Sequence, residues 1–388
     1  MDIDDLLSRM EGFHASDLHL SVSERPVIRC NGKLERIADM PRIDTAHMEG
    51  ILGRLMSEAQ RHELQVEREL DFAINAGRQR FRVNAFFNRH GPAMVLRHIQ
   101  AQPPRLDELG TPAVITSLAE MEKGLILVTG PTGSGKSSTL AAMIRHINEN
   151  HARHIITVED PIEFVHESAS SLITQREVGR DTASFKRALR SALREDPDVI
   201  LVGELRDHET IGLALTAAET GHLVLGTLHT TSAHRALLRV VDAMPAAERD
   251  MARTMLASSL QAVIAQSLLP RSGGGRIGAY EILIGTHAVR HMIQENQPSQ
   301  IYSAMQIGSR HGMQTMADAV AGHVRAARVD AAIAEELMRS LGDSDSDREA
   351  APVERRQDRR NPPAPAATLP RDDTPQPAGD RQEGGWSF

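Results

Sequence analysis

The chain has 388 residues, 40% of them hydrophobic and 25% charged, which is ordinary for a globular protein and long enough for two or three domains. Its formal net charge of -8 gives no general basic field, so a nucleic-acid binder is not favoured. The single cysteine, Cys30, excludes an internal disulfide and a multi-cysteine zinc site, as expected for a protein of a reducing cytosol.

The N-terminal segment, MDIDDLLSRMEGF, is acidic and lacks the basic stretch and apolar core of a secretory signal. No apolar run approaches the ~20 residues that a membrane-spanning helix needs. We therefore expect a cytoplasmic protein that does not insert into a membrane and that serves any membrane process through a partner.

Residues 1–100 mix short alternating strands with helices, which predicts a smaller α+β domain. The stretch ASDLHLSV (15–22) alternates apolar residues with polar ones such as Asp17, which predicts a half-buried strand. Residues 78–99 are rich in arginine and predict two strands joined by a turn. Residues 101–112 contain three prolines and one glycine, and they predict a linker.

Residues 113–341 have another pattern, in which short apolar runs alternate with amphipathic helices. The segment DTASFKRALRSALRED (181–196) shows the helical spacing of apolar residues most clearly. Such alternation argues for an α/β domain with a mostly parallel sheet and helices on both faces. The predicted strands are Leu125–Val128, Ile155–Val158, Val199–Val202, Leu223–Leu228 and Tyr280–Ile284.

Residues 342–388 are dense in proline, aspartate and arginine and poor in aliphatic residues. Such a segment cannot bury enough apolar surface to offset the entropy lost on ordering, so we expect a disordered tail. The tail is either without function or a tether for a partner.

The first strand of the α/β domain runs into GPTGSGKSS (130–138), which holds the complete G-x-x-x-x-G-K-[ST] pattern of a phosphate-binding loop. A predicted helix follows, as that motif requires. The glycines let backbone N–H groups turn inward around phosphates at a helix N-terminus. Lys136 is expected to reach the β- and γ-phosphates, and the Ser137 hydroxyl to hold Mg²⁺. The expected nucleotide-binding residues are Gly130, Pro131, Thr132, Gly133, Ser134, Gly135, Lys136, Ser137 and Ser138.

Acidic residues follow the second strand in ITVEDPIEF (156–164). Carboxylates at this place can be turn residues or helix caps, and Pro161 fits that interpretation. Beside a phosphate loop, however, carboxylates are the groups that water activation and Mg²⁺ chemistry require. The acidic residues are Glu159, Asp160 and Glu163.

The third strand ends in VGELRD, which has the Walker-B pattern of a buried strand that delivers a carboxylate, here Glu204, to a metal. The fourth strand lies between His222 and His229. A histidine near a γ-phosphate can sense the nucleotide, although a single histidine is more often structural. Parallel strands present their carboxyl ends at one edge, where ligands bind in open sheets. The residues predicted to meet at this edge are Gly130, Glu159 or Asp160, Glu204 and His229.

Together these motifs resemble the PilT family of type IV pilus retraction ATPases, in the secretion-ATPase superfamily. The resemblance covers about residues 1–320 and rests on ASDLHL, GPTGSGKSSTLAAM, ITVEDPIEFVHE, QREVGRDT, ALRSALREDPDVILVGELRD and TAAETGHLVLGTLHTTSA. It implies a PAS-like domain before a RecA-like P-loop ATPase domain, in a homo-hexamer. It also implies hydrolysis of ATP with Mg²⁺ to retract a pilus at the inner-membrane pilus base. The implied partners are a platform protein of that membrane and a paralogous retraction ATPase.

The same resemblance assigns roles to single residues. Glu159 and Glu163 fall on the family's Asp box, and His222 and His229 fall on its His box. Water activation is implied for Glu163 and Mg²⁺ coordination for Glu204, although an exchange of these two roles stays open. Among the arginines of the N-terminal domain, Arg82 and Arg97 best match those that offset the charge built up in phosphoryl transfer.

One segment departs from the family. Its AIRNLIRE motif, tied to retraction, reads AVRHMIQE at 288–295, where four positions agree and four differ. Both the main retraction motor and the accessory retraction ATPase (PilU) therefore remain open.

Other functions fit less well. Extension and secretion ATPases typically carry a tetracysteine zinc element, which a chain with one cysteine cannot build. A non-motor nucleotide-binding regulator would be expected to lack the catalytic carboxylates, yet Glu163 and Glu204 are present. A GTPase is disfavoured because no Asn-Lys-x-Asp motif occurs, and a DNA helicase is disfavoured by the charge balance.

Overall fold

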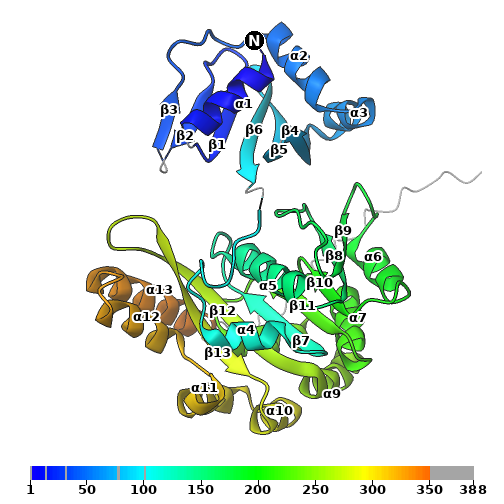
Figure 1. Ribbon diagram of the computed structural model, residues 1–388, viewed down its shortest axis with the longest axis vertical. Coiled ribbons are helices and arrows are strands. Elements are labelled where there is room, and N and C mark those ends of the chain that lie inside the picture. Colours follow the sequence, from blue (N-terminus) through cyan, green and yellow to red (C-terminus); the bar gives the residue numbers. More distant parts are fainter. Residues whose placement is uncertain (1, 14, 31–32, 77–78, 100–101, 350–388) are drawn as a thin grey trace, which may run out of the picture. The chain divides into compact units, whose positions relative to one another are not determined.

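The structure is a computed structural model that describes residues 2–13, 15–30, 33–76, 79–99 and 102–349. Two sheets organise these residues, one six-stranded and antiparallel, the other seven-stranded and mostly parallel (Figure 1). The predicted fold class is therefore confirmed: a mostly parallel α/β domain preceded by a smaller α+β domain. Among the described residues, no helix has both the length and the apolar character that crossing a membrane requires.

The N-terminal domain is built on the antiparallel sheet, with strand order β3-β2-β1-β6-β5-β4. The two strands predicted in residues 78–99 are β5 and β6, which pair from Arg80 opposite Ile99 to Asn88 opposite Gly91. The elements are α1 (Ile3–Gly12), β1 (Asp17–Ser21), β2 (Val27–Cys30), β3 (Lys33–Arg36), α2 (Thr45–Leu55), α3 (Glu58–Glu67), β4 (Glu69–Ala76), β5 (Gln79–Asn88) and β6 (Gly91–Ile99).

The core of this domain follows from two periodicities. In α1 the buried residues Ile3, Leu6 and Met10 recur at helical spacing, and Asp2 caps the helix by accepting from the Asp4 N–H. In β1 Leu18 and Leu20 alternate inward and join the same core.

Asp17 differs from the expectation for a solvent-facing position of β1, because it is only 4% exposed. Arg97 donates from Nε to its carboxylate at 2.7 Å, and Ser16 donates from Oγ at 2.8 Å. Burial alone would raise the pKa of Asp17, but these hydrogen bonds outweigh it and hold that pKa below its ordinary value. A charged partner on β6 thus allows a carboxylate inside the sheet.

The parallel sheet has the strand order β13-β12-β7-β11-β10-β8-β9, with only β13 antiparallel to its neighbour. Its strands are β7 (Gly124–Thr129), β8 (His154–Glu159), β9 (Leu172–Glu177), β10 (Val199–Val202), β11 (Leu223–Leu228), β12 (Leu260–Pro270) and β13 (Arg276–Ile284). The five predicted strands appear as β7, β8, β10, β11 and β13. Sequence reasoning missed β9 and β12.

The helices that follow the linker cover both faces of this sheet (Figure 1). Successive residues of β7 point to opposite faces, so Leu125 and Leu127 pack with α7 to α9, whereas Ile126 and Val128 pack with α4 and α5. The helical elements are α4 (Ala113–Ala119), α5 (Lys136–Asn150), α6 (Phe185–Ala192), α7 (His208–Glu219), α8 (Ala233–Asp242), η1 (Ala246–Glu248), α9 (Arg249–Ser259), α10 (His287–Gln294), α11 (Pro298–Ile307), η2 (Ser309–His311), α12 (Met316–Arg325) and α13 (Ala331–Glu349).

Helix α13 continues past Leu341, where we expected the tail to begin, and ends at Glu349. The first proline beyond it is Pro352, a residue type that a helix interior excludes. The rest of the predicted tail, residues 350–388, lies outside the described residues.

Candidate functional site

The phosphate-binding loop joins β7 to α5, and its glycines have backbone conformations that other residues rarely adopt. Gly130 has φ 143° and Gly135 has φ 91°. A Cβ atom on Gly130 would lie 2.4 Å from the carbonyl oxygen of Gln266, and one on Gly135 would lie 2.7 Å from the Gln266 amide nitrogen. Glycine is therefore required where the loop passes β12.

Lys136 is the first residue of α5, and its ammonium group turns back over the loop. Nζ donates to the carbonyl oxygens of Gly130 at 2.7 Å and Pro131 at 3.0 Å. Burial lowers the pKa of Lys136, while the negative charges of Glu204 and Glu163 oppose that shift. The structure thus brings Lys136 within electrostatic range of both predicted catalytic carboxylates.

Glu204 and His229 follow the neighbouring parallel strands β10 and β11. The His229 Nε2 atom lies 3.3 Å from Oε1 of Glu204, and an Arg206 Nη2 atom lies 2.7 Å from Oε2. Two residues predicted from separate motifs therefore meet at one edge of the sheet. The Glu204 side chain is 20% exposed, so a ligand at this edge can reach its carboxylate.

A threonine pair ties the loop strand to the segment that carries His229. Thr129, the last residue of β7, donates its hydroxyl to the Thr230 carbonyl oxygen at 2.7 Å and accepts from the Thr230 N–H at 2.9 Å. The two hydroxyl oxygens are 2.8 Å apart. Thr230 is thereby held against the last residue of β7, and His229 directly precedes Thr230 in the chain.

Glu159 lies at the same edge, but its carboxyl group is engaged within the domain. Thr157 donates its hydroxyl to it at 2.7 Å, and the Gln175 amide donates at 3.2 Å. Burial raises the pKa of Glu159 to about 7, against the effect of these hydrogen bonds. Partial protonation at neutral pH makes this carboxyl a poor ligand for a cation.

His222 does not lie with Lys136, Glu204 and His229. It precedes Leu223, which pairs with Gly124 at the amino end of β7, whereas the phosphate loop follows the carboxyl end. Its Nδ1 atom lies 2.9 Å from the Ala217 carbonyl oxygen, a contact that fixes the turn after α7. A residue that precedes a parallel strand lies at the opposite edge of the sheet from a residue that follows one.

Arg82 and Arg97 stand directly opposite each other on β5 and β6, and so on one face of the N-terminal sheet. An Arg82 Nη2 atom lies 3.5 Å from the Asp71 carboxylate, and Arg97 donates to Asp17. The two predicted arginines thus form a pair whose charges are offset within the domain.

Two participants of the site, Gln266 and Thr230, were not among the predicted site residues. Gln266 of β12 is buried, borders Gly130 and Gly135, and accepts from the Thr139 hydroxyl at 2.8 Å. Thr230 holds Thr129. The available signal for Gln266 was a polar residue inside the apolar run LQAVIAQSLL.

Residues 2–339 match the family described as type II/IV secretion system protein. Over 317 residues the chain is 52% identical to the type IV pilus retraction ATPase PilT of Pseudomonas aeruginosa, a match that covers 81% of this chain and 92% of that protein. The chain is a PilT-type ATPase of this family. It is also 39% identical over 322 residues to the type IV pilus ATPase PilU of the same organism, covering 82% of this chain and 84% of PilU. A crystal structure of the pilus retraction motor PilT with bound ADP matches with a TM-score of 0.81 at 44% identity, covering 87% of this chain and 96% of that one.

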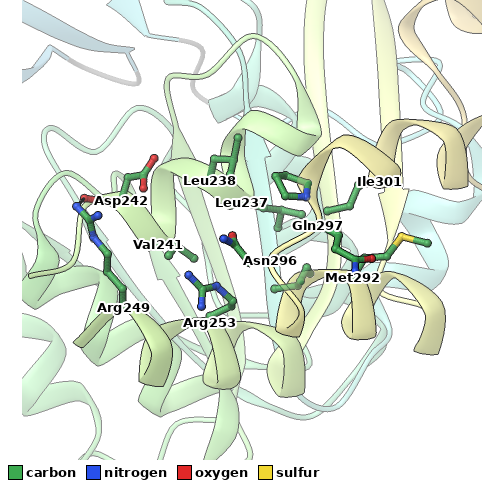
Figure 2. Close-up of a pocket in the computed structure, with 12 residues that line it drawn as sticks. Leu237, Leu238, Val241, Asp242, Arg249, Arg253, Met292, Asn296, Gln297 and Ile301 are labelled. Carbon is green, nitrogen blue, oxygen red and sulfur yellow. Dashed lines mark hydrogen bonds between the residues drawn. The ribbon is translucent and has the colours of Figure 1, made fainter. Parts of the chain in front are cut away.

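The PilT-type chain has a hollow of about 170 Å³ away from the phosphate loop (Figure 2). Helices α8 to α11 form it on the face of the sheet opposite α5. Apolar side chains such as Leu237 and Val241 line it together with the two arginines Arg249 and Arg253, as Figure 2 shows. Met292 of α10, within the segment that departs from the retraction motif, is among the lining residues.

Proposed function

We propose that the protein is a hexameric ATPase motor that drives type IV pilus retraction, and with it twitching motility. The observation that carries the proposal is the grouping of Lys136, Glu204 and His229 at the carboxyl edge of the sheet in a PilT-type chain. A phosphate loop alone would fit many classes of nucleotide-binding protein. A carboxylate and a histidine in contact beside the loop favour one that hydrolyses the nucleotide.

In the proposed mechanism the loop N–H groups and Lys136 bind the phosphates of ATP. The incoming oxygens replace the carbonyls of Gly130 and Pro131 as acceptors for Nζ, so the ammonium exchanges neutral partners for charged ones. Glu163 orients and deprotonates the attacking water, although exchange of this role with Glu204 stays open. Arg82 and Arg97 offset the charge of the transferred phosphoryl group after releasing Asp71 and Asp17.

The donors near the loop fit Mg²⁺, which prefers hydroxyl and carboxylate oxygens. The Ser137 hydroxyl and the accessible carboxylate of Glu204 would hold it, Glu204 partly through water. When bound, Mg²⁺ neutralises charge on the β- and γ-phosphate oxygens. Glu159, with its raised pKa, and His222, at the opposite edge, are weaker candidates for direct contact with the nucleotide.

After hydrolysis, the link from Thr129 to Thr230 and His229 gives a route by which loss of the γ-phosphate changes the position of the segment after β11. In a homo-hexamer each such change would move one subunit against the next. The motor would act at the cytoplasmic face of the inner membrane, on a platform protein at the pilus base.

An accessory role of the PilU kind is the second candidate, and the altered segment 288–295 is the observation that favours it. Partnership with a paralogous retraction ATPase would follow from either role. The higher identity to PilT than to PilU favours the main motor. A regulator without hydrolysis is disfavoured because its ATP site would not need Glu204 and His229 in contact.

The test combines hydrolysis with motility. Glu204→Gln should bind ATP but hydrolyse it roughly 100-fold more slowly or worse, whereas Glu122→Gln, at an exposed glutamate before β7, should match the wild type. A deletion strain should be hyperpiliated and should not twitch, and only the Glu122→Gln gene should restore movement. Wild-type turnover by Glu204→Gln would remove Glu204 from the mechanism, and a deletion strain that still twitches would exclude the main motor.

A further inference from the structure

A cluster of metal-ligating side chains lies at the other end of the phosphate-loop helix. One ring nitrogen of His146, one of His151 and a carboxylate oxygen of Glu120 all lie within 4.8 Å of one another. Glu120 caps the C-terminus of α4, His146 lies in the last turns of α5, and His151 is the C-cap of α5. We propose that these three residues bind a divalent transition metal of the zinc class.

The spacing of the ligands fits a metal. The Nε2 atom of His146 lies 3.2 Å from Oε1 of Glu120, and the two imidazole rings meet edge to face with centroids 6.5 Å apart. Bonds of about 2.0–2.2 Å to nitrogen and oxygen place neighbouring tetrahedral ligands about 3.3 Å apart. His151 leaves α5 in an extended conformation, φ -131° and ψ 144°, which places its ring off the helical path of its neighbours. Small side-chain rotations would therefore bring all three ligands onto one ion.

The donor set selects the kind of metal. Two imidazoles and one carboxylate suit Zn²⁺ and its neighbours among the transition metals, whereas Mg²⁺ and Ca²⁺ prefer oxygen alone. Three protein ligands leave a coordination position for water. The Nε2 atom of His151 is buried and, within the part of the chain that the structure describes, has no hydrogen-bond partner. A buried nitrogen without a hydrogen-bond partner is free to serve as a metal ligand.

Charges near the three ligands act on a cation in two opposite ways. The C-terminal carbonyl ends of α4 and α5 meet there, and the negative ends of helix dipoles favour a cation. Arg153 opposes it with a positive charge, but its guanidinium is bound to the carbonyl oxygens of Met121 at 2.8 Å and Glu120 at 3.2 Å. The carboxylate of Glu120 adds a full negative charge that offsets the charge of Arg153, and the carbonyl end of α5 adds to the attraction of a cation.

A metal at this place would join the end of α4 to the end of α5. Helix α5 has 15 residues, so its two ends are about 22 Å apart, and the metal would not share ligands with nucleotide bound at Lys136. The inference is thus independent of the proposed retraction function. It would give the phosphate-loop helix a fixed anchor at its far end.

The experiment titrates the full chain, freed of affinity-tag histidines and of metal, with Zn²⁺ in the absence of nucleotide. Titration with Co²⁺ reports the coordination through its visible absorption. One Zn²⁺ per chain should bind, and His146→Gln and His151→Gln should each weaken binding by at least about tenfold. His62→Gln, at an exposed histidine of α3, is the matched control and should bind as the wild type does.

Unchanged ADP affinity in each variant shows that the fold is intact, since the ligands lie far from the phosphate loop. Glu120→Gln, at an exposed cap, provides a second variant with little risk to folding. Its Zn²⁺ affinity should fall and its Co²⁺ spectrum should change. Equal Zn²⁺ affinity in the wild type and in His146→Gln and His151→Gln would assign any binding to other histidines of the 18 in the chain and overturn the proposal.

Discussion

The substitution Thr129→Val removes only the hydroxyl of Thr129, because valine has nearly the same shape as threonine. Thr129 is fully buried, and its hydroxyl serves both the N–H and the carbonyl oxygen of Thr230. Without it these two backbone groups lose their partner, at a cost of about 1–3 kcal/mol for an unsatisfied buried group. Thr230 is only half-buried, so water can replace part of the loss and the lower half of this range applies. For a domain of this size, about 1–2 kcal/mol lowers the unfolding midpoint by roughly 2–8 °C.

The same change should separate binding from turnover. The loop glycines and Lys136 are untouched, so ADP affinity by calorimetry should stay near that of the wild type. His229 loses its tie to β7, and ATP turnover should fall about tenfold or more because misplacement by about 1 Å is costly in catalysis. Thr216→Val is the control, since its hydroxyl bonds only to the Gly212 carbonyl on the exposed side of α7. A Thr129→Val protein that matches Thr216→Val in both midpoint and turnover would refute the coupling.

Three further predictions address the loop, the titration of Glu159 and the tail. Lys136→Ala removes the charged donor, so ATP affinity measured by calorimetry should fall roughly 10- to 100-fold, and an unchanged Kd would contradict the assignment. Because the native pKa of Glu159 is raised to about 7, its contribution to stability is complete below the ordinary carboxyl pKa and is lost as the pH rises toward 7. Glu159→Gln should therefore flatten the free energy of unfolding between about pH 5 and about pH 8, and an unaltered slope would show that Glu159 does not titrate there. Truncation after Glu349 spares α13 and should leave turnover and oligomer mass intact; a ring that dissociates would assign the remaining residues to assembly.

Much of the α/β domain was predictable because its strands are buried on both faces and are therefore continuously apolar. The runs before Gly130, Glu159, Glu204 and His229 met this condition. Strand β9 lies at the sheet edge and reads LITQRE, with too few apolar residues to stand out. Strand β12 follows α9 without a turn, so its apolar run could not be distinguished from helix.

The partners within the site could not be predicted from local pattern. Thr129 and Thr230 are 101 residues apart, and Thr139 and Gln266 are 127 apart. Periodicity indicates which residues face inward, but strand order decides which of them touch. The meeting of Glu204 with His229 could be predicted because both follow parallel strands, and the same rule places His222, which precedes its strand, at the other edge.

Both the agreeing and the differing positions of segment 288–295 include buried and exposed residues. Arg290, which agrees with the retraction motif, donates to the carbonyl oxygen of Leu260 at 3.0 Å and to the amide oxygen of Gln261 at 3.2 Å, so it braces α10 against the start of β12. Its retention therefore follows from the fold. Val289 is buried and replaces isoleucine with a similar residue. The other differing positions are half-buried or exposed: His291, Met292 and Gln294. The departure thus changes the exposed surface of α10 at His291 and Gln294, and at Met292 it changes a side chain that packs against the core. None of these residues belongs to the group at the phosphate loop, so a measurement of ATP turnover cannot separate a main motor from an accessory one, whereas a measurement that includes the pilus machinery can.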